Sequence, residues 1–204
     1  MTKAHPTREI LIEAALTLFA AEGYRGTTVR KIEKAAGLSQ GAGGMYRHFR
    51  SKDELLLAAV ERYRADVRAF IERAPALLHG DTRAQLVLAA TLVREFNERN
   101  DALLRVLILE HQALPAVAQR SFEAAWEEGY RFYAAWLADH LGPGLRVDAE
   151  AAAIQLFGSL AQYQVQERTF TRPPLGVTHD RFIEAWADHW SAFIRAARAA
   201  RPPV

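Results

Sequence analysis

Hydrogen-bond donors gather a short way into the chain, where Tyr46, Arg47 and His48 are consecutive and Lys52 follows four residues later. Phenol, guanidinium, imidazole and ammonium groups are donor types that proteins place on the phosphate oxygens of nucleic acids. The pattern therefore indicates recognition of an anionic partner.

Two short helices joined by a turn would position these donors. Residues 28–49 begin with an amphipathic helix whose apolar positions include Ile32 and Ala36. Gly37 permits a left-handed turn residue, and Ser39 is able to cap a second helix. Two helices joined by a glycine-containing turn are typical of the helix-turn-helix, whose second helix enters a major groove of DNA.

This segment and its flanks resemble the DNA-binding domain of the tetracycline-repressor (TetR) family over about residues 7–65. In that family three N-terminal helices bind DNA, a fourth connects them to a helical ligand-binding body, and the last two helices pair with those of a second subunit. Beyond residue 65 the chain is similar to the family only in the number and length of its helices. The residues that carry the resemblance are Arg8 to Phe19, Gly23 to Thr28, Ile32, Ala35 to Ser39, Tyr46 to Phe49 and Ser51 to Leu55.

The stretch that would read DNA departs from the family pattern. Family members usually place four residues between the serine of the turn and the following tyrosine, whereas six residues separate Ser39 from Tyr46. Three of those six are glycine, and each glycine inside a helix costs roughly 0.5–1 kcal/mol relative to alanine. Either the turn is longer and the recognition helix begins near Ala42, or that helix is frayed until DNA orders it.

The resemblance implies that some polar residues and glycines of this segment contact DNA bases and that others contact phosphates. Glycine would let the backbone come close to DNA. The alternative interpretation treats the polar side chains as ordinary solvated residues and the Tyr-Arg-His end as a helix terminus packed on the first helix. The expected base-reading residues are Arg30, Gln40, Ala42, Gly43 and Gly44, the expected phosphate contacts are Thr28, Tyr46, Arg47, His48 and Lys52, and Ser39 and Gly41 complete the predicted DNA-binding set.

Charge is distributed unevenly along the 204 residues, although the formal net charge is only +2. Residues 1–52 hold nine Lys and Arg against four Glu, a balance of +5, whereas the rest of the chain has a balance of −3. Such an asymmetry favours nucleic acid or an anionic surface as the partner of the basic segment. Solvation of an exposed helical face is the alternative explanation.

Composition and spacing disfavour a helical-bundle enzyme or a metal-binding bundle, which is the rival function. The chain has no cysteine, so thiolate metal sites, disulfides and cysteine nucleophiles are excluded. None of the seven histidines has Glu or Asp three residues before it, as a di-iron bundle requires. A phosphate-binding lysine loop and a Gly-x-Ser-x-Gly elbow are also absent from the sequence. We expect no enzymatic activity, no cofactor and no metal.

Membrane segments are not expected either. The longest apolar runs, such as residues 55–60, fall far short of the roughly 20 residues that cross a bilayer. Residues 1–8 lack the apolar stretch of a signal peptide. The sequence therefore predicts a cytoplasmic protein with no membrane partner.

Apolar residues recur at helical spacing almost throughout, and the alternation of a half-buried strand is missing. The pattern predicts an all-α fold of about nine helices. Two domains are expected, a DNA-binding domain at 5–65 and a ligand-binding and dimerisation domain at 66–204. The expected helices are three within 7–49, one from Ser51 to Pro75, one beginning near Asp81, and others at about 103–112, 115–141, 148–168 and from 180 onward.

Candidate ligand contacts in the second domain are ionisable or aromatic. Glu110 and His111 interrupt a helix that is otherwise apolar, and burying ionisable groups is costly unless they are paired. They would orient a ligand, or they would form hydrogen bonds with neighbouring polar groups at the end of the helix. An aromatic stripe on the 115–141 helix resembles a pocket lining, although such stripes also form ordinary core. The predicted ligand-binding set is Tyr63, Arg94, Glu110, His111, Trp126, Tyr130 and Tyr133.

Large apolar residues on the last two helices exceed what one edge of a bundle needs. A subunit interface rich in aromatics would account for them, and burial inside one subunit is the alternative. The predicted interface consists of Phe157, Leu160, Trp186, Trp190 and Phe193.

Together these features predict a homodimeric transcription factor, a repressor that leaves a pseudo-palindromic DNA operator when a small-molecule effector occupies the body. One short recognition element makes too few base contacts, whereas two elements about 34–36 Å apart, or a multiple of that distance, read a palindrome. The long helix from residue 52 to about 74 would transmit the movement.

Overall fold

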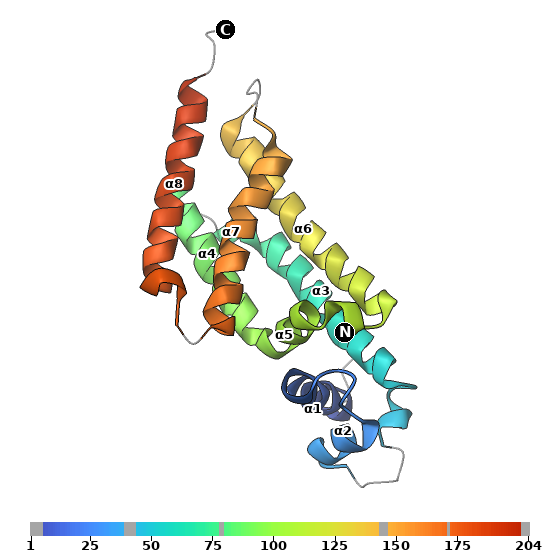
Figure 1. Ribbon diagram of the computed structural model, residues 1–204. Coiled ribbons are helices and arrows are strands. Elements are labelled where there is room, and N and C mark those ends of the chain that lie inside the picture. Colours follow the sequence, from blue (N-terminus) through green and yellow to red (C-terminus); the bar gives the residue numbers. More distant parts are fainter. Residues whose placement is uncertain (1–5, 39–43, 78–79, 143–146, 171, 201–204) are drawn as a thin grey trace. The chain divides into compact units, whose positions relative to one another are not determined.

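The computed structural model describes residues 6–38, 44–77, 80–142, 147–170 and 172–200, and these residues form helices and turns without a strand. The predicted all-α fold is confirmed. The described helices, in chain order, are α1 (Pro6–Glu22), α2 (Val29–Ala35), α3 (Lys52–Leu77), α4 (Thr82–Arg99), α5 (Asp101–Leu109), α6 (Ala116–Leu141), α7 (Ala149–Thr169) and α8 (His179–Ala199), with short 3-10 turns η1 (Met45–Arg47), η2 (His111–Ala113) and η3 (Pro174–Gly176) (Figure 1).

The structure has eight described α-helices where about nine were expected, and the difference lies in the glycine-rich segment. Residues 39–43 are outside the described residues, and the part that follows is the 3-10 turn η1. A tighter 3-10 turn is a common form for short helical pieces. The register of a recognition helix in 39–43 therefore stays a prediction.

Several helix starts follow from side chains that accept otherwise unpaired backbone N–H groups. Asp148 accepts from the backbone of residues 150 and 151 at the start of α7, and Thr28 accepts from Lys31 at the start of α2. Ahead of α3, the Ser51 hydroxyl accepts the Glu54 N–H at 3.1 Å, and the Glu54 carboxylate accepts the Arg50 N–H at 2.7 Å.

The described residues form two compact units, and each is described by itself. The head unit comprises Met1–Arg68 and Asn97–Ala125, and the body unit comprises Ala69–Phe96 and Trp126–Val204. This division differs from the predicted domain boundary at residue 65, because α5 packs against α1 and so joins the N-terminal helices. None of the helices in the described ranges is long and apolar enough to cross a membrane.

The core of the head unit contains large apolar side chains from α1, α2, α3 and the segment before α3. Leu11 and Phe19 of α1, Ile32 of α2, Phe49 between η1 and α3, and Leu56 of α3 are at most 1% exposed. Each such buried side chain contributes about 1.5–3 kcal/mol relative to its exposed state. Their burial fixes the positions of α1, α2 and the start of α3 within the unit.

The core of the body unit lies among α4, α6, α7 and α8. Leu137 of α6, Leu156 and Leu160 of α7 and Ile194 of α8 are completely buried there. Arg83 at the start of α4 adds a surface link by pairing with Asp188 of α8 at 2.6 Å. Exposed pairs of this kind contribute only about 0–1 kcal/mol, so apolar packing holds the unit together.

Candidate nucleic-acid interface

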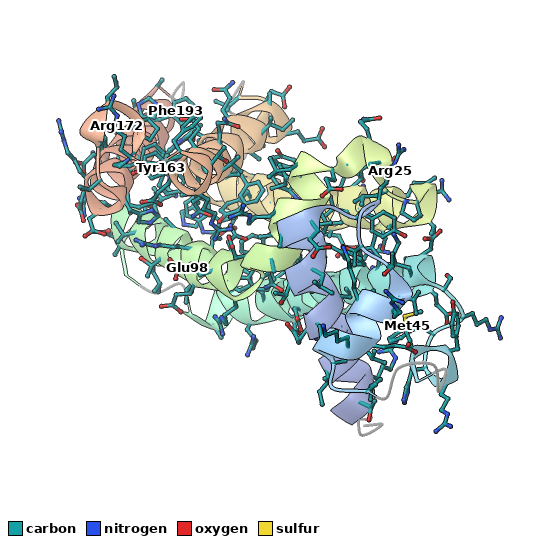
Figure 2. All side chains as sticks on the ribbon, turned by 60° about the horizontal axis from the view of Figure 1, so that its bottom comes forward. Arg25, Met45, Glu98, Tyr163, Arg172 and Phe193 are labelled. Atoms are coloured by element: carbon teal, nitrogen blue, oxygen red, sulfur yellow. The ribbon has the colours of Figure 1, made fainter. Side chains whose placement is uncertain are left out.

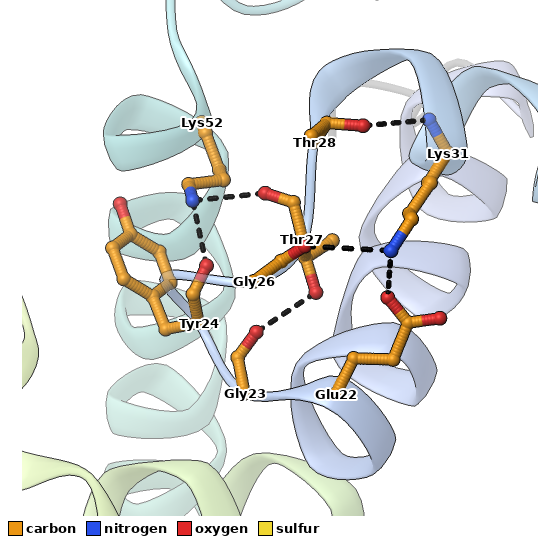
Figure 3. A network of polar contacts seen from close by, with 8 residues as sticks. All are labelled: Glu22, Gly23, Tyr24, Gly26, Thr27, Thr28, Lys31 and Lys52. Atoms are coloured by element: carbon orange, nitrogen blue, oxygen red, sulfur yellow. Dashed lines mark hydrogen bonds and ion pairs between the residues drawn. The ribbon is translucent and has the colours of Figure 1, made fainter.

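The turn between α1 and α2 is held by a network of polar contacts (Figure 3). The Thr27 hydroxyl donates to the Gly23 carbonyl at 2.9 Å, and the Lys31 ammonium pairs with the Glu22 carboxylate at 2.5 Å. Thr28 then caps α2. These contacts fix where α2 begins, and hence the direction in which its exposed residues point.

Lys52 completes the network from α3. Its Nζ donates to the carbonyls of Tyr24 and Thr27 at 2.6 and 3.0 Å and lies 4.2 Å from the centre of the Tyr24 ring. Burial lowers the pKa of Lys52, and the nearby carboxylates of Asp53 and Glu110 oppose that shift. In this structure Lys52 stabilises the turn, and a phosphate contact by it stays a prediction.

A buried carboxylate positions the donors that follow the glycine-rich segment. Glu33 of α2 is 5% exposed, and its Oε1 accepts the backbone N–H of Met45 at 3.0 Å. Met45, labelled in Figure 2, is itself completely buried. Sequence reasoning missed Glu33, although a lone acid among the basic residues of α2 was a usable signal.

The predicted DNA-binding residues divide into three groups. Thr28, Arg30, Tyr46 and Arg47 are exposed, and Tyr46 keeps 60% of its surface open to solvent. Gly44, His48 and Lys52 are half-buried. Ser39, Gln40, Gly41, Ala42 and Gly43 lie outside the described residues.

Gly44 has a local packing reason to be glycine. A Cβ at this position would come within 2.9 Å of the Leu38 side chain. Close packing of the segment on Leu38 therefore explains the residue without a base contact, and its predicted base-reading role stays untested.

Residues 11–59, which include most of α1, all of α2 and the start of α3, match the model of the family described as bacterial regulatory proteins, tetR family. This segment is similar to the N-terminal domain of TetR-family regulators. Among curated relatives, the transcriptional repressor AcnR of Corynebacterium efficiens is 44% identical over 52 residues, which are 26% of this chain and 27% of that protein. The nucleoid occlusion factor SlmA of Klebsiella pneumoniae is 34% identical over 107 residues, which are 52% of each chain.

Solved structures extend the likeness beyond the TetR domain. A TetR-family transcriptional regulator from Mesorhizobium loti is 25% identical, with a TM-score of 0.71 over 96% of this chain and 98% of that one. A tetR-family regulatory protein from Rhodococcus is 20% identical, with a TM-score of 0.67 over 95% and 98%. The matched segments span only about a fifth to a half of the curated relatives' length, so their likeness rests on the N-terminal part.

The predicted ligand-binding residues are divided between the two units. Tyr63, Glu110 and His111 belong to the head unit, whereas Arg94, Trp126, Tyr130 and Tyr133 belong to the body unit.

In the head unit, Tyr63 and His111 both lie near Phe122. Tyr63 is 6% exposed, burial raises its pKa, and its ring centre lies 6.1 Å from that of Phe122. His111 Nε2 is 3.1 Å from a carboxylate oxygen of Glu123, and its ring lies 6.3 Å from Phe122. The carboxylate of Glu110 accepts the backbone N–H of Tyr24 in the turn between α1 and α2.

In the body unit, the predicted aromatic stripe gathers around Phe157. The Phe157 ring stacks on Tyr133 at 5.2 Å, meets the edge of Tyr130 at 5.2 Å and lies 5.8 Å from Trp126. Burial raises the pKa of Tyr133 and of Tyr130. These contacts are those of packed core, and a ligand role for the stripe stays a prediction.

Three of the five predicted interface residues are buried within the single chain, and their place in a subunit interface stays a prediction. Leu160, Trp186 and Trp190 are 0, 5 and 6% exposed in the single chain, so they have little surface left for a partner. Trp186 also donates its indole N–H to the Leu156 carbonyl at 3.2 Å. Phe157 and Phe193 are half-buried against the same core. Large apolar side chains on these helices serve the body unit's own packing.

One part of the exposed surface of α7 and α8 has a different character, although other exposed positions of these helices, such as Glu150, Glu184 and Asp188, are charged. This part carries small or uncharged polar side chains and a half-buried glycine, Gly158, next to which an added Cβ would meet no atom within 4 Å. We call this surface the small-residue face, and it comprises Ala151, Ile154, Gln155, Gly158, Ser159 and Gln162 of α7 with Ala185, His189 and Ala192 of α8. Sequence reasoning missed it because it searched for aromatic residues.

Proposed function

We propose that the protein is a sequence-specific DNA-binding transcriptional regulator that represses its target genes in the cytoplasm. The observation that carries the proposal is the TetR-type head with exposed Arg30, Tyr46 and Arg47 held in place by the buried Glu33 to Met45 hydrogen bond. Exposed donors with fixed positions are suited to bind DNA phosphates, and such phosphate contacts set the position and orientation of a protein on the duplex. Repression, rather than activation, is supported by the name of the AcnR relatives.

Dimerisation supplies the second head that a palindromic operator requires. We assign the contact to the small-residue face, because small uncharged side chains let two helices approach closely without burying unpaired charge. Ile154, which is 55% exposed in the single chain, would be covered there. The residues predicted from sequence, Trp186 and Trp190, would support this face from beneath.

Release from DNA would follow from a small molecule that binds one conformation of the dimer better than the other. A ligand shifts such an equilibrium only by its differential affinity for the two states. Tyr63 and His111 in the head unit and the aromatic cluster around Phe157 in the body unit are the candidate contacts.

Gel-shift competition with the DNA upstream of the gene itself tests the proposal. The expected result is a complex that survives excess unrelated DNA at moderate salt, because specific sites bind typically 10³–10⁷-fold tighter than others. Binding that ignores sequence at every salt concentration would overturn the proposed function.

A further inference from the structure

Each polar group of Tyr24 is engaged by a residue distant in the chain. Its backbone N–H donates to Oε2 of Glu110 at 2.8 Å, its carbonyl accepts from Lys52 at 2.6 Å, and its phenol donates to Asp53. The residue is 5% exposed. Two of these partners come from the start of α3, whereas Glu110 comes from the end of α5 and lies 86 positions away in sequence.

The Glu110 carboxylate also lies directly against Gly23. Gly23 has a φ of +80°, and a Cβ there would lie 3.4 Å from both carboxylate oxygens. Its own N–H closes the end of α1 by donating to the Phe19 carbonyl at 3.0 Å. The carboxylate therefore lies against the turn at the point where α1 ends, and the positive φ of Gly23 is what favours glycine at this position.

A negative charge at the C-terminal end of a helix is unfavourable by itself. Here two features offset that cost. The Tyr24 N–H donates to the carboxylate, and the Lys52 ammonium attracts it, since Glu110 raises the pKa of Lys52 against the lowering by burial. Charge-assisted hydrogen bonds are roughly twice as strong as neutral ones. The hydrogen bond from the Tyr24 N–H to the Glu110 carboxylate is therefore stronger than a hydrogen bond between two neutral groups.

Glu110 stands between the turn and the chain that leads into α6. It ends α5, and the next residue, His111, begins η2 with its ring near Phe122 and its Nε2 near Glu123 of α6. Consecutive residues thus contact the α1–α2 turn on one side and α6 on the other. Any movement of α6 that shifts His111 acts on Glu110 through a single peptide unit.

We propose that Glu110 is a positioning residue that fixes the orientation of the DNA-reading helices on α5, and so sets the half-site spacing that the dimer accepts. The inference rests on the proposed function. It assigns to one carboxylate a contact from α5 that acts beside the contacts that Lys52 and Asp53 of α3 make with the same turn.

The test measures operator spacing with the full-length dimer. Wild type, Glu110→Ala and Glu110→Gln are titrated onto the selected operator, onto versions lengthened or shortened by one and two base pairs, and onto a single half-site. Glu110→Ala is expected to lose about tenfold in preference for the native spacing, the effect of one charge-assisted hydrogen bond, and to bind the half-site as wild type does. Glu110→Gln keeps an acceptor oxygen and is expected to retain most of the preference.

Two measurements separate positioning from folding. Exchange of the Tyr24 amide hydrogen is expected to quicken in Glu110→Ala and less in Glu110→Gln, and denaturant unfolding monitors stability. Glu127→Ala is the matched control, because Glu127 is an exposed glutamate of the body unit that pairs only with Arg131 within its own helix in the contacts described.

Three results would overturn the inference. The first is a Glu110→Ala variant that keeps the wild-type spacing preference. The second is an equal loss of affinity for the half-site and for the full operator, because that result indicates a damaged head unit rather than a reoriented one. Unchanged Tyr24 exchange is the third. If wild type selects no DNA sequence, the proposed function fails, and Tyr24 exchange separately decides whether Glu110 holds the turn.

Discussion

The carboxylate of Glu33 accepts the backbone N–H of Met45 across 12 positions of sequence at 3.0 Å. Both residues are buried, so the hydrogen bond is shielded from water. It joins α2 to the turn that precedes Tyr46 and Arg47, on the far side of the glycine-rich segment. The exposed donors therefore have a defined position in the head unit whatever conformation residues 39–43 adopt.

Replacing Glu33 by alanine should destabilise the head unit. The change leaves the Met45 N–H buried without its acceptor, which costs about 1–3 kcal/mol. Urea unfolding should show that loss, and Glu33→Gln should show less of it because an acceptor remains. Glu22→Ala is the control, since it removes only an exposed pair with Lys31. Equal losses in the two alanine variants would contradict a special role for Glu33.

Replacing Arg47 by alanine should weaken DNA binding through one phosphate contact. The slope of log affinity against log salt should then fall in magnitude by about 0.9, and affinity should drop similarly for operator and unrelated DNA. Fluorescence anisotropy over a salt series measures both quantities. Arg131→Ala, an exposed arginine of α6, should leave the slope unchanged. A loss confined to the operator would instead indicate base reading by Arg47.

Replacing Gly158 by leucine should disrupt the proposed dimer without harming the subunit. The site has open space beside it in the single chain, so the added side chain fits there and would block a second helix. Sedimentation velocity should show monomer at concentrations where wild type is dimeric. Gly158→Ala adds one methyl group, improves helix propensity by about 0.5–1 kcal/mol, and should remain dimeric. A dimeric leucine variant would rule out this face.

Replacing Phe157 by alanine should leave a cavity among Trp126, Tyr130 and Tyr133. Loss of a core phenylalanine costs about 3–5 kcal/mol, and the half-buried position of Phe157 places the expected value near the lower end. Phe170→Ala is the matched control because Phe170 is 58% exposed, and it should change the free energy of unfolding by less than about 0.5 kcal/mol. Similar losses in both variants would argue against the cluster as core.

Acid should destabilise the body unit through His179. Burial and the charge of Arg94 lower its pKa from the ordinary value of 6.5, and Glu167 and Asp180 only partly oppose the shift. Between pH 6.5 and the lower native pKa, the unfolded chain binds more protons than the native one, so stability falls as pH falls through that interval. Denaturation midpoints from pH 8 to pH 5 should drop less in His179→Gln. Parallel curves would show that His179 does not contribute.

Sequence alone was sufficient for the helical class and for the DNA-binding segment. Helical spacing, the Ser51 to Glu54 pair and the Asp148 cap are local properties, because they depend on residues three or four positions apart. The TetR-type motif is likewise contained in one continuous stretch. The structure agrees with these expectations for that reason.

Only the tertiary structure decided what the longer-range residues do. The burial of Trp186 and Trp190 depends on how α7 and α8 pack in the body unit. The hydrogen bond from the Tyr24 N–H to Glu110 joins residues that are 86 positions apart in sequence. Both outcomes depend on which helices meet and at what distance, and periodicity along a single helix carries no information about that.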